Sequence, residues 1–293
     1  MKQTTVSILM GAYNAERYIV DSIESVLQSN YKDWELIIVD DYSTDNTFEI
    51  LQHYALIDTR IRIFKNEKNL GDYPNRNKTA SYAVGKYLKY LDSDDVIYKY
   101  SLDYMVEAME KHPDAALAIG FNEIDDVSPY PIYNTPKETY QAQFLGKGFL
   151  SYGPSASIIR KNIFDDIGGF LEQNFIGDQE LWLRIALTHP IIKLQPSLVW
   201  YRVHSNQQTN NERKNIFVND IRFKITLQSL KNAESLLSTQ DYKYAETKIK
   251  QHYARTILRH ILKHKKLKEG FSLYKRSQLN IVELLSGFKP FIK

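Results

Sequence analysis

The sequence predicts an α/β protein, with a mainly parallel sheet flanked by helices and a C-terminal helical extension. Over the first two hundred residues, short β-branched runs alternate with amphipathic helical patterns, which is typical of βαβ units with right-handed crossovers. From Asn210 onward only helical periodicity remains. Residues 210–293 carry 18 Lys or Arg and 7 Asp or Glu, whereas the rest of the chain is acidic. We therefore expect one domain over residues 1–209 and a basic helical extension over residues 210–293.

The elements of the first domain follow in order along the chain. Strands are expected over residues 6–10, 34–41, 60–66, 86–95, 155–161 and 197–204. Helices are expected over residues 15–29, 43–55, 73–85, 101–112 and 176–187. Residues 122–148 contain three prolines and break this rhythm. We interpret them as a loop-rich excursion, in which an antiparallel hairpin is one alternative.

Composition excludes several classes of protein. The chain has 293 residues, 43% of them hydrophobic and 25% charged, as in a soluble globular protein. No stretch approaches the roughly 20 apolar residues of a membrane helix, and the apolar run from Val6 to Met10 is too short for a signal peptide. The absence of cysteine excludes disulfides and thiolate zinc sites. We expect a cytoplasmic protein.

An acidic run, Asp92-Ser93-Asp94-Asp95, directly follows a hydrophobic strand. Like charges at a strand end repel each other unless a cation lies there. One interpretation is the start of a helix, because Asp and Ser are good N-cap residues and favour the positive end of the helix dipole. The other is a divalent cation held by hard oxygen ligands and shared with a phosphate ligand. This stretch alone leaves both open.

The ends of the other strands carry polar residues as well. Ligands of open parallel sheets bind beyond the carboxyl ends of the strands. The first strand is followed by Tyr13 and Asn14, the second ends in Asp40-Asp41, and the third is followed by Asn69-Leu70-Gly71. Helix capping could explain each pair separately. Several carboxylates at one edge would raise each other's pKa without a cation, so together they favour a metal and an anionic ligand such as a diphosphate.

Seven ordered motifs then carry a resemblance. They are V-S-I-L-M-x-x-Y-N, E-L-I-I-V-D-D-x-S-T-D-N-T, N-x-G-x-x-x-x-R-N, Y-L-D-S-D-D, G-G-F at 168–170, G-D-Q-E-L-W-L-R at 177–184 and Y-R-V-H at 201–204. In this order and spacing, residues 5–209 resemble the family 2 glycosyltransferases with the GT-A fold. The resemblance implies transfer of a sugar from a nucleotide-sugar donor to an acceptor hydroxyl, with inversion at the anomeric carbon.

The resemblance also implies roles for individual residues. Donor binding would fall to Tyr13, Asn14, Asp40, Asp41, Arg76 and Asp92, metal binding to Asp94, Asp95 and His204, and proton removal from the acceptor to Asp178. Asp92 and Asp94 match the D-x-D motif that binds Mn²⁺ or Mg²⁺, and Asp95 could replace Asp94. Alternatives remain for three of these residues: a surface salt bridge for Arg76, a helix N-cap for Asp178 and a structural role for His204.

The chain departs from the family pattern at three positions. The family usually has Pro at the position of Gly11, Gly at that of Tyr42 and an acidic residue at that of Gly177. None of these changes removes a reacting group. Two other functions are kept as alternatives. A nucleotidyltransferase that makes nucleotide-sugars would show a glycine-rich phosphate loop, and residues 11–18 supply only one glycine. A binding module without turnover would not need Asp92, Asp94 and Asp178.

The expected partners are a nucleotide-sugar donor and a carbohydrate or lipid-linked acceptor, in the assembly of a surface polysaccharide or glycoconjugate. No nucleic-acid partner is expected. The segment 255–271 mixes Ile257, Leu258, Ile261 and Leu262 with six Lys or Arg, as an interfacial helix would. The tail could therefore contact the inner face of the membrane. The alternatives are that its apolar residues pack on the catalytic domain or on a second subunit, which would make a homodimer.

Overall fold

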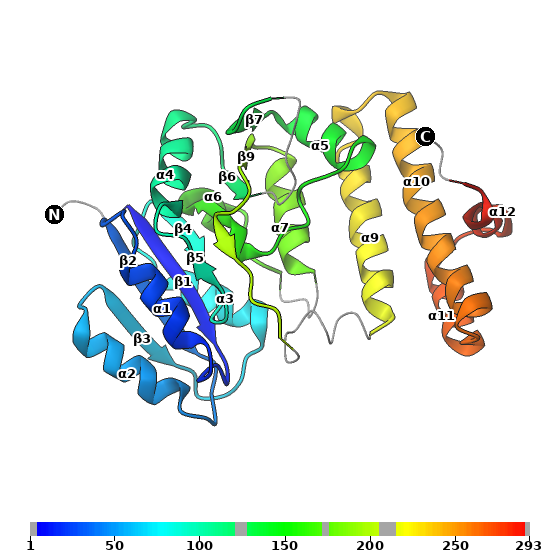
Figure 1. The fold of residues 1–293 in the computed structure, drawn as a ribbon. Helices are drawn as coiled ribbons and strands as arrows, with labels where there is room; N and C mark the ends of the chain where they lie inside the picture. Colours follow the sequence, from blue (N-terminus) through cyan, green and yellow to red (C-terminus); the bar gives the residue numbers. More distant parts are fainter. Residues whose placement is uncertain (1–4, 121–127, 172–175, 205–214, 291–293) are drawn as a thin grey trace. The chain divides into compact units, whose positions relative to one another are not determined.

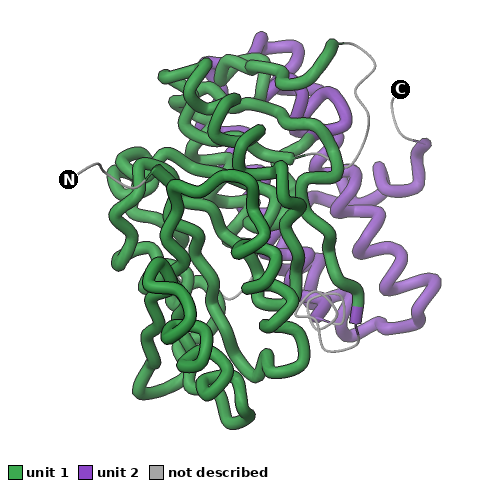
Figure 2. Tube along the Cα trace, turned by 60° about the vertical axis from the view of Figure 1, so that its left-hand side comes forward, with its two compact units in different colours: residues 1–139, 149–203 green, residues 140–148, 204–293 purple. Residues whose placement is uncertain are grey.

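The computed structural model describes residues 5–120, 128–171, 176–204 and 215–290. The chain divides into two compact units, one of residues 1–139 and 149–203 and the other of residues 140–148 and 204–293 (Figure 2). The boundary predicted after residue 209 lies outside the described residues, so it stays a prediction. No helix in the described part of the chain combines the length and the apolar character that crossing a bilayer requires.

The first unit is built on an eight-stranded sheet (Figure 1). Its strands are β1 (Val6–Ala12), β2 (Trp34–Asp40), β3 (Ile61–Lys65), β4 (Tyr87–Tyr90), β6 (Leu117–Gly120), β7 (Ile132–Asn134), β8 (Ser157–Arg160) and β9 (Ile191–Leu194). They lie in the order β3-β2-β1-β4-β8-β6-β9-β7. The first four strands are parallel, β8 runs antiparallel between β4 and β6, and β9 is again parallel to β6. The prediction of an α/β fold with a largely parallel sheet is confirmed.

Helices cover both faces of this sheet. They are α1 (Ile19–Leu27), α2 (Thr47–Ile57), α3 (Asp72–Ser81), α4 (Ser101–Lys111), α6 (Lys161–Asp166) and α7 (Gly177–Ala186). Side chains alternate between the two faces of a strand, and Val6, Ile8 and Met10 share one core with apolar residues of α1, α2 and α4. Helix α3 packs on β1 and β2 from the other face. The packing is close at Gly11, where an added Cβ would lie only 2.9 Å from Asn75 Nδ2.

Several elements differ from the prediction. Residues 86–95 form only the short strand β4, and β5 (Val96–Ile97) pairs with β10 (Val199–Trp200) in a separate small sheet. Strand β10 is much shorter than the predicted 197–204. Strands β6 and β9 were not predicted. In the segment 122–148, residues 121–127 lie outside the described residues; β7 pairs with β9 rather than in a hairpin, and α5 (Pro136–Leu145) follows it.

The second unit is helical where the structure describes it. Its elements are α9 (Phe217–Asn232), α10 (Thr239–Leu258), a π-helical turn η3 (Arg259–Lys263), α11 (Leu267–Ser277) and α12 (Ile281–Leu285). They enclose a core of their own, centred on Phe223, Tyr253, Ile257 and Leu273. Leu258 and Ile261 pack against that core, whereas Leu262 is 58% exposed. The stretch 255–271 is therefore not one interfacial helix, and most of the apolar residues predicted to define it are internal.

Candidate active site

The carboxyl ends of three neighbouring strands form the candidate site. Strand β1 lies between β2 and β4 in the sheet, and Ala12 at the end of β1 pairs with Asp40 at the end of β2. The acidic run follows β4 on the other side of β1. The topology thus confirms the prediction that these strand ends lie at one edge of the sheet. This is the edge at which open parallel sheets bind ligands.

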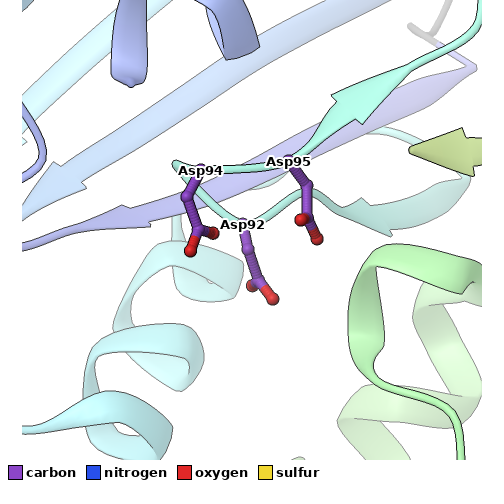
Figure 3. A group of neighbouring side chains, drawn as sticks. All are labelled: Asp92, Asp94 and Asp95. Carbon is purple, nitrogen blue, oxygen red and sulfur yellow. The ribbon is translucent and has the colours of Figure 1, made fainter. Parts of the chain in front are cut away.

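The turn between β4 and β5 gathers three carboxylates, which we call the acidic turn (Asp92, Asp94 and Asp95). One oxygen of each lies within 4.8 Å of the other two, and Figure 3 shows the three side chains projecting from this turn. Asp95 is almost fully buried. Its burial and the neighbouring Asp92 and Asp94 raise its pKa well above the ordinary value. The surroundings of Asp95 therefore disfavour its ionised form.

Hard carboxylate oxygens packed this closely fit the preferences of Mn²⁺ and Mg²⁺. The raised pKa of Asp95 supports the fit, because a cation would stabilise the ionised form that burial and repulsion oppose. These residues start no regular helix of their own, since β5 follows directly and α4 begins only at Ser101. The helix-start interpretation of the acidic run is therefore wrong, and the cation interpretation stays a prediction.

Two buried residues, Ser155 and Lys89, support the acidic turn and the end of β4 through hydrogen bonds. The backbone N–H of Asp92 donates to Ser155 Oγ at 2.9 Å, and the Ser155 side chain also hydrogen-bonds to the carboxyl of Asp95. Lys89 Nζ donates to the carbonyls of Tyr90 and Ser155. Lys89 has no exposed surface, and burial lowers its pKa to about 7. Neither Ser155 nor Lys89 was predicted as a site residue.

Arg202 also binds the acidic turn, through Asp94 and Asp95. Its Nε donates to the Asp94 carbonyl at 2.9 Å, and its backbone N–H donates to Asp95 Oδ1 at 3.2 Å. The guanidinium also pairs with Asp21 at 2.7 Å, and its Cζ lies 4.7 Å from the ring centroid of Tyr18 and 4.8 Å from that of Trp200. The motif Y-R-V-H contains Arg202, but its partners are far away in sequence and a local pattern could not identify them.

Arg76 occupies the centre of the site. Its Nη2 is 2.8 Å from Asp92 Oδ1 and its Nε is 2.7 Å from Asp72 Oδ1. Arg76 therefore forms ion pairs, as the salt-bridge alternative predicted, but they are not at the surface, because only 12% of its side chain is exposed. Asp72 was not predicted, although an Asp four residues before an Arg on a helix is a recognisable ion-pair spacing. Contact of Arg76 with a donor diphosphate stays a prediction.

Asp178 lies in the first turn of α7. The N-cap of this helix is Ile176, at φ +59°, so Asp178 is not the N-cap that the sequence allowed as an alternative. Its Oδ1 accepts the backbone N–H of Gln179 at 2.7 Å. Burial raises the pKa of Asp178 to about 6. The positive charge of Arg76 lowers this pKa, whereas the negative charges of Asp72 and Asp92 raise it. The candidate base and the acidic turn therefore belong to one electrostatic environment.

A rigid connection fixes Asp178 relative to Arg76. Asn77 on α3 donates to the carbonyl of Phe170 at 2.7 Å and accepts its N–H at 2.9 Å. From the other side, Arg184 on α7 donates to the carbonyl of Gly169 at 2.7 Å. Gly169 itself has φ +66°, and its added Cβ would lie 2.7 Å from Asn77 Oδ1. The G-G-F turn thus connects the helix of Arg76 to the helix of Asp178.

Tyr13 and Asn14, predicted for the nucleoside, follow β1. Tyr13 is 52% exposed at this edge, and a ring on which a base stacks has to be accessible. The Asn14 backbone N–H donates to Ser43 Oγ at 2.9 Å, and Asn14 Oδ1 accepts the N–H of Thr44 at 2.9 Å. Asn14 therefore connects the loops that follow β1 and β2. The contacts of both residues with a donor stay predictions.

The two predicted carboxylates after β2 are both internal. Asp40 has no exposed surface, and its Oδ1 finds no hydrogen-bond partner among the described residues. Both oxygens of Asp41 are engaged, because they accept the N–H groups of Leu70 and Gly71 and the amide of Asn66. Asp41 therefore organises the loop before α3, and nucleoside contacts of either carboxylate stay predictions.

His204 is half-buried and belongs to the second unit. The structure does not place it relative to the acidic turn of the first unit, so its role as a metal ligand stays a prediction.

Comparison with known proteins decides the family. Residues 7–168, more than half of the chain, match the family described as "Glycosyl transferase family 2". The chain is a family 2 glycosyltransferase. The match includes all of β1 except Val6, as well as β2, the acidic turn and the first glycine of the G-G-F turn, at position 168. Membership of a glycosyltransferase family favours transfer over the nucleotidyltransferase alternative, and it confirms the resemblance seen in the sequence.

Two curated relatives are similar over about two fifths of the chain. The putative teichuronic acid biosynthesis glycosyltransferase TuaG of Bacillus subtilis is 43% identical over 117 residues, which are 40% of this chain and 46% of that protein. The UDP-Glc:alpha-D-GlcNAc-diphosphoundecaprenol beta-1,3-glucosyltransferase WfgD of Escherichia coli is 41% identical over 113 residues, which are 38% of this chain and 44% of that protein. The match therefore spans less than half the length of either relative.

Two solved structures share the fold over nearly the whole chain. S. aureus TarS 1-349 in complex with UDP-GlcNAc has a TM-score of 0.62 at 16% identity, covering 94% of this chain and 90% of that one. The mannosyltransferase PcManGT from Pyrobaculum calidifontis, in complex with GDP-Man and Mn²⁺, has a TM-score of 0.61 at 13% identity, covering 97% and 79%. At these identities the likeness shows the GT-A fold alone.

In this glycosyltransferase, close packing explains why position 177, before Asp178, is glycine and not the acidic residue usual in the family. A Cβ at Gly177 would lie 2.8 Å from Cε1 and Cζ of the Tyr73 ring, closer than real Cβ contacts come. Tyr73 is buried and stacks on Phe170 of the G-G-F turn, with ring centroids 5.3 Å apart. An acidic side chain at position 177 would therefore displace either the ring or the first turn of α7.

We expect Gly177→Ala to lower the sugar-transfer rate by about 10- to 100-fold, because a small displacement of a catalytic group has effects of that size. The overpacked contact with Tyr73 should also reduce the free energy of unfolding by about 1–3 kcal/mol. Steady-state kinetics and thermal melting measure the two effects. Gly153→Ala is the matched control, because a Cβ there meets nothing within 4 Å. Wild-type kinetics and melting for Gly177→Ala would refute this role of the Tyr73 contact.

Proposed function

We propose that this protein is an inverting glycosyltransferase that transfers a sugar from a UDP-sugar to a hydroxyl of a lipid-linked acceptor, in the assembly of a surface polysaccharide. The observation that carries the proposal is the juxtaposition of the acidic turn, Arg76 and Asp178 at one sheet edge. Arg76 pairs with Asp92 at 2.8 Å, and its charge and that of Asp92 act on Asp178. A diphosphate and an acceptor hydroxyl could then occupy adjacent positions.

Inversion needs one carboxylate near the acceptor. Asp178 takes the proton of the acceptor hydroxyl while that oxygen forms a bond to the anomeric carbon, and the bond from this carbon to the diphosphate breaks on the opposite face. A pKa of about 6 keeps Asp178 ionised at neutral pH and makes it more basic than an exposed carboxylate. Arg76 offers a fixed positive charge to the departing diphosphate.

Asp92, Asp94 and Asp95 are the residues that would hold a divalent metal. When bound, such an ion neutralises negative charge on the donor diphosphate. The complex of PcManGT with GDP-Man and Mn²⁺ supports this assignment, and so does the spacing of the three carboxylates. His204 is proposed as a further ligand or diphosphate contact, on the strength of the family motif alone.

The relatives support the proposed substrates. The name of WfgD gives UDP-Glc as its donor and a diphosphoundecaprenol-linked sugar as its acceptor, and the name of TuaG gives teichuronic acid biosynthesis. TarS is solved with UDP-GlcNAc. Two of these three proteins thus have a UDP-sugar in their name or bound in their structure, and the third is named for the biosynthesis of teichuronic acid. On that basis we propose UDP as the nucleotide and a lipid-linked saccharide as the acceptor.

A thermal-shift screen of UDP, GDP and dTDP, each with and without Mn²⁺, tests the donor. We expect UDP with Mn²⁺ to raise the melting temperature most, because a ligand that binds only the folded state stabilises it by mass action. Asp94→Ala should reduce this shift, whereas the exposed Asp103→Ala on α4 should leave it unchanged. If GDP or dTDP gives the larger shift, the UDP assignment is wrong.

Release of free sugar from the preferred UDP-sugar then separates an enzyme from a binding module. Slow metal-dependent hydrolysis without an acceptor is expected of the enzyme. Nucleotide binding without any hydrolysis or transfer would contradict the proposed activity.

A further inference from the structure

One face of the second unit is both apolar and basic. Helix α11 turns Leu273 and Ser277 inward, toward the core of that unit. Its outer face carries Leu267 and Phe271, one turn apart, which are 55% and 60% exposed. Leu262, at 58% exposed, lies in the π-helical turn that precedes it. Exposed apolar side chains occur elsewhere on this chain, such as Leu56 and Ile57 on α2, so their exposure alone does not identify a binding surface.

Lysines surround these apolar residues. Between Arg259 and Gln278 the chain has seven Lys or Arg and a single acidic residue, Glu269. Lys266 pairs with Glu269, and Arg276 pairs with Asp220. The remaining lysines, which are exposed and form no salt bridge with another described residue, are Lys263, Lys265, Lys268 and Lys275. We call Leu262, Leu267, Phe271 and these four lysines the α11 face.

The core of the unit holds this face in shape. A Cβ at Gly270 would overlap Cγ1 of Ile261, so only glycine lets α11 pack this closely on the π-helical turn. Lys265, at φ +54°, reverses the chain between the two segments. Ile257 and Leu273 are fully buried beneath them. The described core of this unit is thus formed without Leu262, Leu267 and Phe271, which remain exposed.

The charge around the apolar residues distinguishes this face from α12. Ile281 and Val282 on α12 are 59% and 73% exposed, but Glu283 lies beside them and pairs with Lys250. A protein partner could cover either surface. Of these two helices, α11 is the one whose exposed apolar side chains lie among several lysines without a salt bridge to another described residue, and that combination matches the surface of a bilayer that contains anionic lipid.

We propose that the α11 face docks the protein on anionic bilayers. Leu262, Leu267 and Phe271 enter the boundary between headgroups and acyl chains, while the four lysines remain among the anionic headgroups. The docking requires neither nucleotide nor acceptor, so it is independent of the proposed enzymatic activity.

Co-sedimentation of the full chain with vesicles tests the proposal. We expect binding at low salt to vesicles of phosphatidylcholine and phosphatidylglycerol in equal amounts, and little binding to pure phosphatidylcholine. Raising the salt concentration should weaken the binding, because the electrostatic part is screened. The double variant Leu267→Ser/Phe271→Ser should bind at least about tenfold more weakly. The triple variant Lys263→Gln/Lys265→Gln/Lys268→Gln should lose about 100-fold at low salt.

The matched control is Leu56→Ser/Ile57→Ser, which changes two exposed apolar residues in the first unit. It should bind vesicles like the wild type. All variants should keep the melting temperature and the nucleotide-dependent thermal shift, which excludes unfolding as the cause of a loss. Three results would overturn the proposal: no binding to anionic vesicles at low salt, equal binding to neutral ones, or an equal loss in the Leu56/Ile57 control.

Discussion

Asp178→Asn is expected to lower the rate of sugar transfer by about 100-fold or more, while donor affinity stays within about twofold. The amide cannot accept the acceptor proton, but it keeps the shape of the carboxylate. Its Oδ1 can still accept the N–H of Gln179, so the first turn of α7 should remain intact. Transfer kinetics give the first quantity, and titration of the nucleotide followed by thermal shift gives the second.

The pH profile provides a second readout of the same residue. Burial raises the pKa of Asp178 to about 6, and only the ionised carboxylate can act as a base. The transfer rate should therefore rise as pH increases through about 6 and then level off. Asp95 also has a raised pKa, so the profile is measured at saturating Mn²⁺, where protonation of the metal ligands competes least.

Asp166→Asn is the control, because it changes an exposed carboxylate on α6 to the same amide. It should leave both the rate and the pH profile unchanged. If Asp178→Asn instead abolishes donor binding while the rate per bound donor stays normal, then Asp178 is a binding or structural residue and the proton is removed by another group.

Removal of divalent metal is expected to abolish transfer. Chelation by EDTA should reduce activity to background, and excess Mn²⁺ or Mg²⁺ should restore it. Asp94→Ala should weaken nucleotide binding in the presence of Mn²⁺, because one of three closely spaced ligands is lost. Asp94 projects from the turn, whereas the backbone of that residue is held by Arg202. The substitution should therefore leave the acidic turn in place.

Two results would contradict the metal assignment. One is full activity in EDTA after exhaustive dialysis against the chelator. The other is an unchanged dependence on Mn²⁺ in Asp94→Ala and in Asp95→Asn, which would place the ion elsewhere. The acidic turn would then be a charged loop held only by Ser155, Lys89 and Arg202.

Local patterns in the sequence were sufficient for the central sheet and for the edge at which ligands bind. Strands β1, β2 and β4 are apolar runs that end in polar residues, and a parallel βαβ arrangement brings such ends together whatever the helices between them contain. Helix α5 lies in a segment predicted as a loop, although its sequence contains the residues that typically begin a helix. Its Thr135 and Glu138 hydrogen-bond reciprocally as a capping box, and Pro136 stands at the first helical position, where proline is favoured.

The scaffold of the acidic turn could not be predicted in this way. Ser155, Lys89 and Arg202 act through contacts between residues that are far apart in the chain, such as the 63 positions between Asp92 and Ser155. A lysine within an apolar strand gives no sign of which carbonyls it will meet. The same limit applies to the tail, where amphipathic periodicity continued through the chain reversal at Lys265. The periodicity was real, but most of its apolar residues, Ile257, Leu258 and Ile261, pack in an internal core.

The ion pair between Arg76 and Asp92 has a consequence for the order in which ligands are held. A cation that enters the acidic turn shares Asp92 with a guanidinium already 2.8 Å away, and the repulsion between the two positive charges weakens its binding to the empty protein. A nucleotide diphosphate brings the negative charge that offsets this repulsion. Thermodynamic linkage requires that each ligand then strengthens the other by the same factor. We expect metal and nucleotide to enter and leave as a cooperative pair, so that the ion is released when the nucleotide product departs.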